Sequence, residues 1–382
     1  VISKDVYYKG VNLGSLVKGE LINILVNYIK KFFELYKISK QFGDFTFIGS
    51  YTCCKIMKNF SKKTIKFQNS KIKNSQQFPL DLIKIKMQIG TKNHSKEFGI
   101  SKNLFKKLKS VSEKSSKLLL PKNSSITDVS KNVLIIEFDP IKYQSFFKQM
   151  PYSELNFLIY NRRRPAIWNF QSYNLIKKSG CFIETENSLS NANLKKIISN
   201  GRFQTETKIL DLFSKESFFK SFFSIEGISF WPTFKEFFQE YFQKRALEFI
   251  EEIELTKKLM EKYRFSSILI LSEAGQNERI ALQLGCQEKI PVCMVQHSIH
   301  YDTKESYDMM VAKGSLPINS DHYLCWGRIS KEYSQNMGIE TEKIHSVGSA
   351  VYDDVRFDEE HCSKKEHVLL ATGSPTKEHA AD

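Results

Sequence analysis

The sequence predicts an α/β fold with a mostly parallel β-sheet that helices cover on both faces. From residue 132 onward, short apolar runs typical of buried strands alternate with helical stretches at the spacing of strand-helix-strand units. Polar residues and glycines follow these runs, as they do where parallel strands open onto a ligand crevice. A last apolar run over residues 367–374 resembles the first, over residues 133–139, and this repetition predicts a second lobe of the same kind.

The apolar runs define the expected strands. Residues 133–139 form a continuous apolar run that ends in an acid before Pro140, which fits a strand buried on both faces. The other runs end in the same way, at a polar residue or a glycine. The expected strands cover residues 133–139, 156–160, 266–273, 291–297, 322–327 and 343–349.

Helices are expected between these strands and ahead of them. Apolar residues recur at spacings of three and four from residue 13 to residue 38, which predicts an amphipathic helix that packs on the core or lies on a membrane surface. Pro232 suits a first helical turn and is expected to begin a helix. The other expected helices cover residues 173–178, 191–199, 204–219, 277–284 and 330–337. Phenylalanines crowd residues 218–249, where core packing is favoured over a lipid-facing or acceptor-facing surface.

Positive charge is concentrated in the first third of the chain. The net charge is +15, yet residues 1–130 alone sum to +17, with 25 lysines and 8 acids, and the rest sums to about −2. We therefore divide the chain into a basic, partly helical N-terminal region (1–130), a Rossmann-like lobe (131–360) and the start of a truncated second lobe (361–382). The basic region is expected either to be solvated or to contact an anionic membrane peripherally. Nucleic-acid binding is not favoured, because no known motif for it occurs.

The composition is typical of a cytoplasmic protein. The seven cysteines form no Cys-x-x-Cys pair, and several lie in apolar runs, so a reducing compartment is expected. No window approaches the roughly 18 uncharged apolar residues of a spanning helix, and no signal-peptide pattern is visible. We expect a cytoplasmic location, with peripheral contact at the inner face of the cell membrane as an option. Because the chain begins with Val1 and its last apolar run is not completed, it reads as a fragment.

Residues just after each apolar run are the candidate site, because ligands of a doubly wound sheet bind beyond the carboxyl ends of its strands. His297 is a candidate general base for a sugar hydroxyl, with strand capping as the alternative, and Glu273 is a candidate catalytic carboxylate. No compact ligand spacing joins His322 or His345 to Glu273, so neither a metal nor another cofactor is expected. The candidate substrate-binding residues are Asp139, Arg162, Gln296, His300, Gly348, Ser349, Gly373 and Ser374.

Two glycine-serine pairs, Gly348 with Ser349 and Gly373 with Ser374, are candidate phosphate-binding turns, since a helix start behind each would supply N–H donors. The sequence contains no G-x-G-x-x-G, Walker A or G-x-S-x-G pattern. Their absence argues against a nicotinamide dehydrogenase, a P-loop enzyme and an α/β-hydrolase.

Three segments, taken in order, resemble surface-polysaccharide proteins with the glycosyltransferase-B fold, a group that includes capsule-synthesis and glycerophosphotransferase-type enzymes. Residues 290–297 (IPVCMVQH) are similar to the "IP…QHG" strand of that group. Residues 321–327 (DHYLCWG) are similar to its "D…G" element ahead of a helix. Residues 338–353, which include GIETEKIHSVGS, are similar to its "GI…KI.VGS..YD" element, and the likeness covers about a quarter of the chain.

The resemblance implies transfer of a sugar or sugar-like phosphate group from a nucleotide-sugar donor, without an obligatory metal. The first lobe would hold a glycan or lipid-linked acceptor, and the second lobe would hold most of the donor. By position, His297 is the histidine of the "QHG" element, and Ser298 replaces its glycine. A piece that lacks most of the second lobe would be inactive by itself.

Two further functions fit the same fold. A non-hydrolysing nucleotide-sugar 2-epimerase would use carboxylates and a histidine in the cleft and would need no acceptor. A non-catalytic assembly protein would dock on an anionic membrane or polymer through residues 1–130. In that case His297→Ala would leave surface carbohydrate unchanged, whereas removal of residues 1–130 would abolish it.

Overall fold

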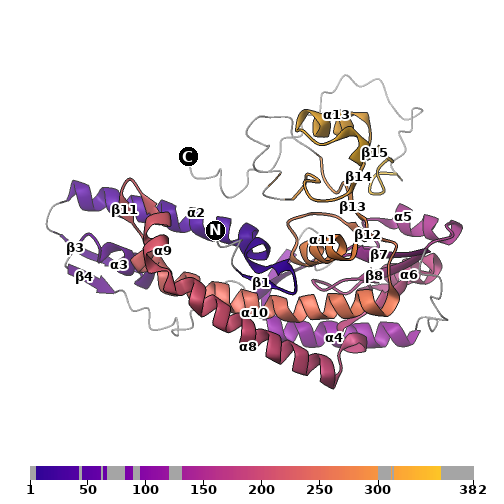
Figure 1. Ribbon diagram of the computed structural model, residues 1–382, viewed down its shortest axis with the longest axis horizontal. Coiled ribbons are helices and arrows are strands. Elements are labelled where there is room, and N and C mark those ends of the chain that lie inside the picture. The colour runs from indigo at the N-terminus through magenta and orange to yellow at the C-terminus, as the bar shows by residue number, and fades with distance from the viewer. Residues whose placement is uncertain are drawn as a thin grey trace.

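The computed structural model describes residues 6–42, 45–61, 63–66, 82–88, 95–119, 131–299, 311 and 314–353. Three candidate site residues, His300, Gly373 and Ser374, lie outside the described residues, and so does the second lobe expected over 361–382. Figure 1 shows an elongated molecule, with a β-sheet at one end and long helices that run from it to the other end.

Seven strands form the central sheet, and every neighbouring pair is parallel. They are β7 (Asn132–Ile136), β8 (Asn156–Tyr160), β9 (Phe182–Glu184), β12 (Ser267–Ile270), β13 (Val292–Val295), β14 (His322–Cys325) and β15 (Ile344–Ser346). Their order across the sheet is β9-β8-β7-β12-β13-β14-β15. In order of appearance this reads 3-2-1-4-5-6-7, the doubly wound order of Rossmann-like sheets, which reverses direction between β7 and β12. The predicted α/β class with a parallel sheet is confirmed.

Helices cover both faces of the sheet because the strands are apolar on both faces. Alternate residues of β7 enter two separate cores: Val133 and Ile135 join one, and Leu134 and Ile136 join the other. The smaller core includes residues of α5 (Gln144–Gln149) and α6 (Phe170–Ser179). The larger core includes residues of α8 (Ala192–Ser214), α9 (Glu216–Phe222), α10 (Trp231–Tyr263) and α11 (Gln276–Glu288).

The aromatic segment packs inside the molecule. Pro232 lies in the first turn of α10, as predicted, and Trp231, Phe234, Phe238 and Phe242 from this helix are fully buried. The Trp231 ring stacks on Phe219 of α9, with ring centroids 4.6 Å apart. The prediction of core packing for this segment is therefore confirmed.

The N-terminal region packs on the sheet lobe through a long helix. The predicted helix over residues 13–38 is confirmed as α2 (Leu13–Gln41), and its apolar stripe lies in the larger core. Two oxygens of Glu20 on this helix accept hydrogen bonds from the Arg245 guanidinium of α10. The region also contains β1 (Tyr7–Tyr8), β2 (Val11–Asn12), β3 (Thr46–Gly49), α3 (Tyr51–Met57), β4 (Lys63–Lys66), β5 (Leu82–Gln88), β6 (Ser95–Ser101) and α4 (Lys102–Leu119).

Two helices continue through glycines at which the sequence predicts an interruption or an end. The predicted helices over 191–199 and 204–219 are mostly one helix, α8, which includes Gly201. The Tyr8 ring packs so closely on Gly201 that an added Cβ would lie 2.3 Å from the Tyr8 hydroxyl oxygen. Helix α11 likewise continues past Gly285, where an added Cβ would lie 2.9 Å from Val292 Cγ2. Close packing, and not chain reversal, explains both glycines.

The remaining elements are α7 (Glu186–Leu189), β10 (Ser224–Ile225), β11 (Ile228–Ser229) and α13 (Arg328–Asn336), together with short 3-10 turns. Strand β9 was not predicted, because three residues are too few for a recognisable alternation. Among the described helices, none combines the length and the apolar character needed to cross a bilayer.

Candidate functional site

The point where the sheet reverses its winding opens onto a cavity of about 520 Å³, which we name the switch-point crevice. Its walls come from the segments that follow four neighbouring strands, β7, β8, β12 and β13, and from the start of α11. This is the position at which doubly wound sheets bind ligands. The lining residues are Glu137, Lys142, Tyr143, Arg163, Arg164, Leu271, Ser272, Gly275, Glu278 and His297.

Glu137 organises the loop that follows β8. Its Oε1 accepts hydrogen bonds from the backbone N–H groups of Arg162 and Arg163, at 2.7 and 3.0 Å, and from Asn277 Nδ2 at 2.7 Å. The residue is buried and adopts a left-handed backbone conformation, with φ 60°. A non-glycine residue adopts this conformation at a cost, so the surrounding contacts must hold it in place.

Glu278 lies in the first turn of α11, and its carboxyl group folds back over Gly275. The carboxylate pairs with the Arg163 guanidinium. Burial raises the pKa of Glu278 to about 7, an effect that Arg163 opposes and the nearby Glu137 charge reinforces. A carboxyl group that titrates near neutral pH can hold or release a proton during a reaction.

His297 follows β13 and contributes an imidazole to the crevice. Burial lowers its pKa below the ordinary value of 6.5, and the positive charges of Lys142 and Arg163 lower it further, while a hydrogen bond with the Leu271 backbone acts in the opposite direction. The imidazole is therefore neutral at pH 7 and able to accept a proton.

Three cationic side chains, Lys142, Arg163 and Arg164, line the crevice. Arg163 pairs with Glu137 and Glu278, and Arg164 pairs with Asp139. Lys142 is therefore the one of the three without a carboxylate partner among the described residues, and it is the cation best placed for an anionic ligand such as a phosphoryl group. Two buried side-chain oxygens, Glu278 Oε2 and the Tyr143 hydroxyl, have no hydrogen-bond partner among the described residues, and Glu137 Oε2 has an ion pair with Arg163 Nε at 3.4 Å but no hydrogen bond. Buried polar atoms are nearly always hydrogen-bonded in folded proteins, so these oxygens indicate a place where water or a ligand binds.

Two of the predicted site residues lie at this crevice or beside it. His297 lines it, as expected for a general base. Asp139 lies one contact away: its Oδ2 pairs with Arg164 Nη1 at 3.0 Å, and its Oδ1 accepts the Ile141 N–H at 3.0 Å. Asp139 therefore holds the β7 turn and orients a crevice cation.

Arg162 points away from the switch-point crevice. Its Nε and Nη2 donate to the two carboxylate oxygens of Glu252 on α10, at 2.6 and 2.8 Å, and Nη1 donates to Glu186. Its buried side chain thus joins the β8 loop to α10. The geometry gives Arg162 a structural contact here and leaves its neighbour Arg163 facing the crevice.

Glu273 and Gln296 both make contacts that hold loops. Both carboxylate oxygens of Glu273 accept hydrogen bonds from the backbone and side chains of Asn319 and Ser320, at 2.8 to 3.1 Å. Gln296 Oε1 accepts the Trp326 backbone N–H at 2.8 Å. Neither residue lines the crevice.

The Gly348 and Ser349 pair follows β15 at the edge of the sheet, three strands from β12. Gly348 adopts a left-handed conformation with φ 85°, and the Ser349 hydroxyl accepts the Tyr352 N–H at 3.3 Å. Neither residue lines the crevice. His322 and His345, on β14 and β15, lie with ring nitrogens 3.1 Å apart, and neither lines the crevice.

Sequence reasoning did not identify Glu137 or Glu278 as site residues, and among the arginines after β8 it named Arg162 instead of Arg163 as the binding residue. The available signal was the acid at position 137, which interrupts an otherwise apolar run. An acid inside a buried strand segment requires partners, and here they are the loop N–H groups and Asn277. Glu278 gave no signal, because acids are common in first helical turns.

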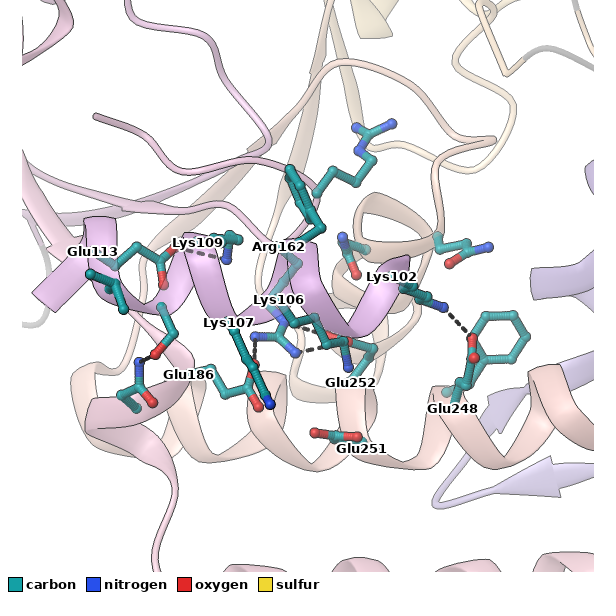
Figure 2. A pocket seen from close by; sticks show the side chains of 18 of the residues that line it. Lys102, Lys106, Lys107, Lys109, Glu113, Arg162, Glu186, Glu248, Glu251 and Glu252 are labelled. Carbon is teal, nitrogen blue, oxygen red and sulfur yellow. Dashed lines mark hydrogen bonds and ion pairs between the residues drawn. The ribbon is translucent and has the colours of Figure 1, made fainter. Parts of the chain in front are cut away.

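A second cavity, of about 790 Å³, lies between α4 and α10 and adjoins the crevice, because Arg163 lines both. Figure 2 shows lysines of α4 and glutamates of α10 around this cavity. Ion pairs cross it or line it, including Lys102 Nζ with Glu248 Oε2 at 2.7 Å.

Comparison with known proteins adds no relative. No protein-family model matches this sequence, and no curated protein matches it at a significant level. What the chain does must therefore be argued from the switch-point crevice and from the motifs of residues 290–353.

Proposed function

We propose that this chain is part of a glycosyltransferase-B-like enzyme of surface-polysaccharide or glycan biosynthesis. It would transfer a sugar, or a sugar-like phosphate group, from a nucleotide-activated donor to a glycan or lipid-linked acceptor. The observation that carries the proposal is a neutral, half-buried His297 in the switch-point crevice, beside three cations and beside a carboxyl group with a pKa of about 7.

In the proposed transfer reaction, His297 is the general base, Glu278 exchanges protons, and the cations stabilise phosphate charge. The acceptor hydroxyl loses its proton to His297 as its oxygen forms a bond to the transferred group, and the bond between that group and the nucleotide phosphate breaks. The nucleotide leaves with the electron pair of that bond. Lys142 and Arg163 stabilise phosphate charge near the crevice, and Glu278 exchanges a proton with bound substrate.

The first test is ligand-induced thermal stabilisation of the intact protein by a panel of nucleoside diphosphates and nucleotide sugars. A ligand that binds only the folded state raises the melting temperature by mass action. A selective shift with one nucleotide and its sugar supports the transferase. No shift with any member, together with no turnover, would favour the non-catalytic assembly protein.

Variants then test the roles. His297→Gln is expected to lower kcat by about 10²- to 10⁴-fold, the usual contribution of a general base, while the ligand-induced shift remains. His345→Gln, at an exposed histidine of β15 that does not line the crevice, is the matched control. Lys142→Gln is expected to weaken ligand binding, and Lys148→Gln, on the exposed surface of α5, should not. Full activity of His297→Gln would rule out its role as the base.

A further inference from the structure

Helix α4 presents its charged face to the protein. Figure 2 shows lysines of this helix directed toward α10, where Lys102 pairs with Glu248. About two turns later on the same face, Lys109 and Glu113 form a buried ion pair at 2.7 Å. This orientation is the reverse of an ordinary surface helix, which turns its apolar stripe toward the core.

The apolar face of α4 is consequently exposed. Leu104, Leu108 and Val111 have exposed fractions of 47%, 56% and 64%. Their spacing of four and three residues places them on one side of the helix. A contiguous exposed apolar stripe on a strongly amphipathic helix marks an interaction surface.

An exposed lysine, Lys114, flanks this stripe and forms no ion pair among the described residues of α4 and its neighbours. Lys107 lines the cavity between α4 and α10, and Figure 2 shows its side chain directed toward α10. The acid of the helix, Glu113, is buried and paired with Lys109. The outward face of α4 is therefore apolar in its centre and positively charged at its border.

Two exposed aromatic residues lie beside the same helix. The Ser112 hydroxyl of α4 donates to the backbone oxygen of Ile167, at 3.4 Å, which brings the 167–170 loop against α4. In that loop Trp168 and Phe170 are 52% and 78% exposed. Trp is one of the two residue types, with Tyr, that are enriched at the headgroup level of a bilayer in membrane proteins.

We propose that α4, together with Trp168 and Phe170, is a docking surface for an anionic lipid bilayer. The leucines and the aromatic rings enter the interface, and Lys114 contacts the anionic headgroups. Apolar burial combined with lysine attraction is how amphipathic helices bind at a membrane surface without crossing it. This inference does not depend on the proposed catalytic function.

The test is flotation of the intact protein with vesicles of two compositions. One set contains phosphatidylcholine alone, and the other contains equal amounts of phosphatidylcholine and phosphatidylglycerol. We expect binding to the second set, weaker binding at high salt, and roughly a tenfold or greater loss of partitioning for Leu108→Glu, because an apolar contact is replaced by a repelled charge.

A control variant tests whether the loss of vesicle binding is specific to α4 or follows from any exposed apolar residue replaced by glutamate. Ile329→Glu makes the same kind of change at an exposed apolar residue of α13, and Figure 1 shows α13 and α4 on opposite sides of the sheet. Its vesicle binding should equal that of the unmodified protein. Equal losses for both variants would contradict a docking surface at α4.

A spectroscopic measurement reports docking independently of these variants. Addition of anionic vesicles should shift the tryptophan emission to shorter wavelength, and Trp168→Phe should remove that shift. Trp231 is fully buried in the core, and the half-buried Trp326 follows β14, where its indole N–H donates to the Gln296 backbone oxygen. If the protein binds neither vesicle set, the proposal is wrong. So would self-association that Leu108→Glu abolishes, because the occupant of the surface would then be a second copy of the chain.

Discussion

At the residue scale, the fold raises the pKa of the Glu278 carboxyl group into the neutral range, and this shift makes a testable prediction about stability. Its carboxyl group is buried against Gly275 and Arg163, and its pKa lies near 7 instead of near 4.5. Between these two pH values the folded protein keeps a proton that the unfolded chain has lost. Stability therefore falls as the pH rises through this window.

Glu278→Gln removes this dependence. Between pH 4.5 and pH 8 the unmodified protein should lose on the order of 3 kcal/mol of unfolding free energy relative to the variant, at 1.36 kcal/mol per pKa unit. Urea denaturation at several pH values measures it. Glu340→Gln, at an exposed glutamate, controls for loss of one carboxylate. A difference that stays constant with pH would contradict the raised pKa.

Arg162 and Arg164 allow a second matched comparison, because one ion pair is buried and the other is exposed. Arg162→Met leaves the Glu252 and Glu186 carboxylates without their partner and should cost about 3–5 kcal/mol of stability. Arg164→Met removes the exposed pair with Asp139 and should cost no more than about 1 kcal/mol. Urea denaturation curves measure both, and equal costs would show that Arg162 is not a structural anchor.

The three consecutive arginines also show how far the sequence determines the site. Their position after a strand correctly places them near the carboxyl edge of the sheet, and Arg162 was the expected ligand residue. Which arginine faces the crevice depends on partners far along the chain, Glu252 for Arg162 and Glu278 for Arg163. Such distant pairs leave no local pattern, whereas His297 was placed correctly because it directly follows an apolar strand.

At the scale of elements, two helical glycines show how packing can outweigh helix propensity. Glycine weakens a helix interior by roughly 0.5–1 kcal/mol relative to alanine, so substitution by alanine normally stabilises. Gly19 in α2 has open space around an added Cβ, whereas at Gly201 in α8 an added Cβ would overlap the Tyr8 ring. The two positions therefore predict opposite outcomes.

Gly19→Ala should raise the unfolding free energy by about 0.5–1 kcal/mol, and Gly201→Ala should lower it by about 1–3 kcal/mol, because overpacking must displace Tyr8. The displaced tyrosine would also lose the 2.7 Å hydrogen bond from its hydroxyl to Glu254. Thermal and urea denaturation measure both changes. If Gly201→Ala stabilised the protein, the Tyr8 ring of β1 would be able to move away from α8 without loss of free energy.

The elements themselves were predicted where their period was strong. The long stripe of α2 and the apolar runs of β8 and β13 specify their own structure, so a single sequence identifies them. Strand β9 and the continuity of α8 through Gly201 depend on neighbours in the fold. The orientation of α4, with its apolar face outward, was not predicted. A periodic pattern identifies the apolar face of a helix, but it does not show which surface that face contacts.

At the scale of the whole molecule, the crevice and the docking surface are separate structures that share one neighbour. The cavity beneath α4 and the switch-point crevice share Arg163 in their linings. The lining of the cavity includes several paired charged side chains, which disfavours an apolar ligand such as a lipid tail.

Because the two surfaces use different residues, their variants should act independently. Leu108→Glu should abolish binding to anionic vesicles and leave the nucleotide-induced thermal shift unchanged, and Lys142→Gln should do the reverse. In the double variant both losses should appear at their single-variant size, since distant sites without shared partners contribute additively. Vesicle flotation and thermal denaturation, done on the same four proteins, measure this. If Leu108→Glu also reduces the thermal shift, the two surfaces are coupled, and Arg163, which lines both the crevice and the cavity beneath α4, is the first residue to test.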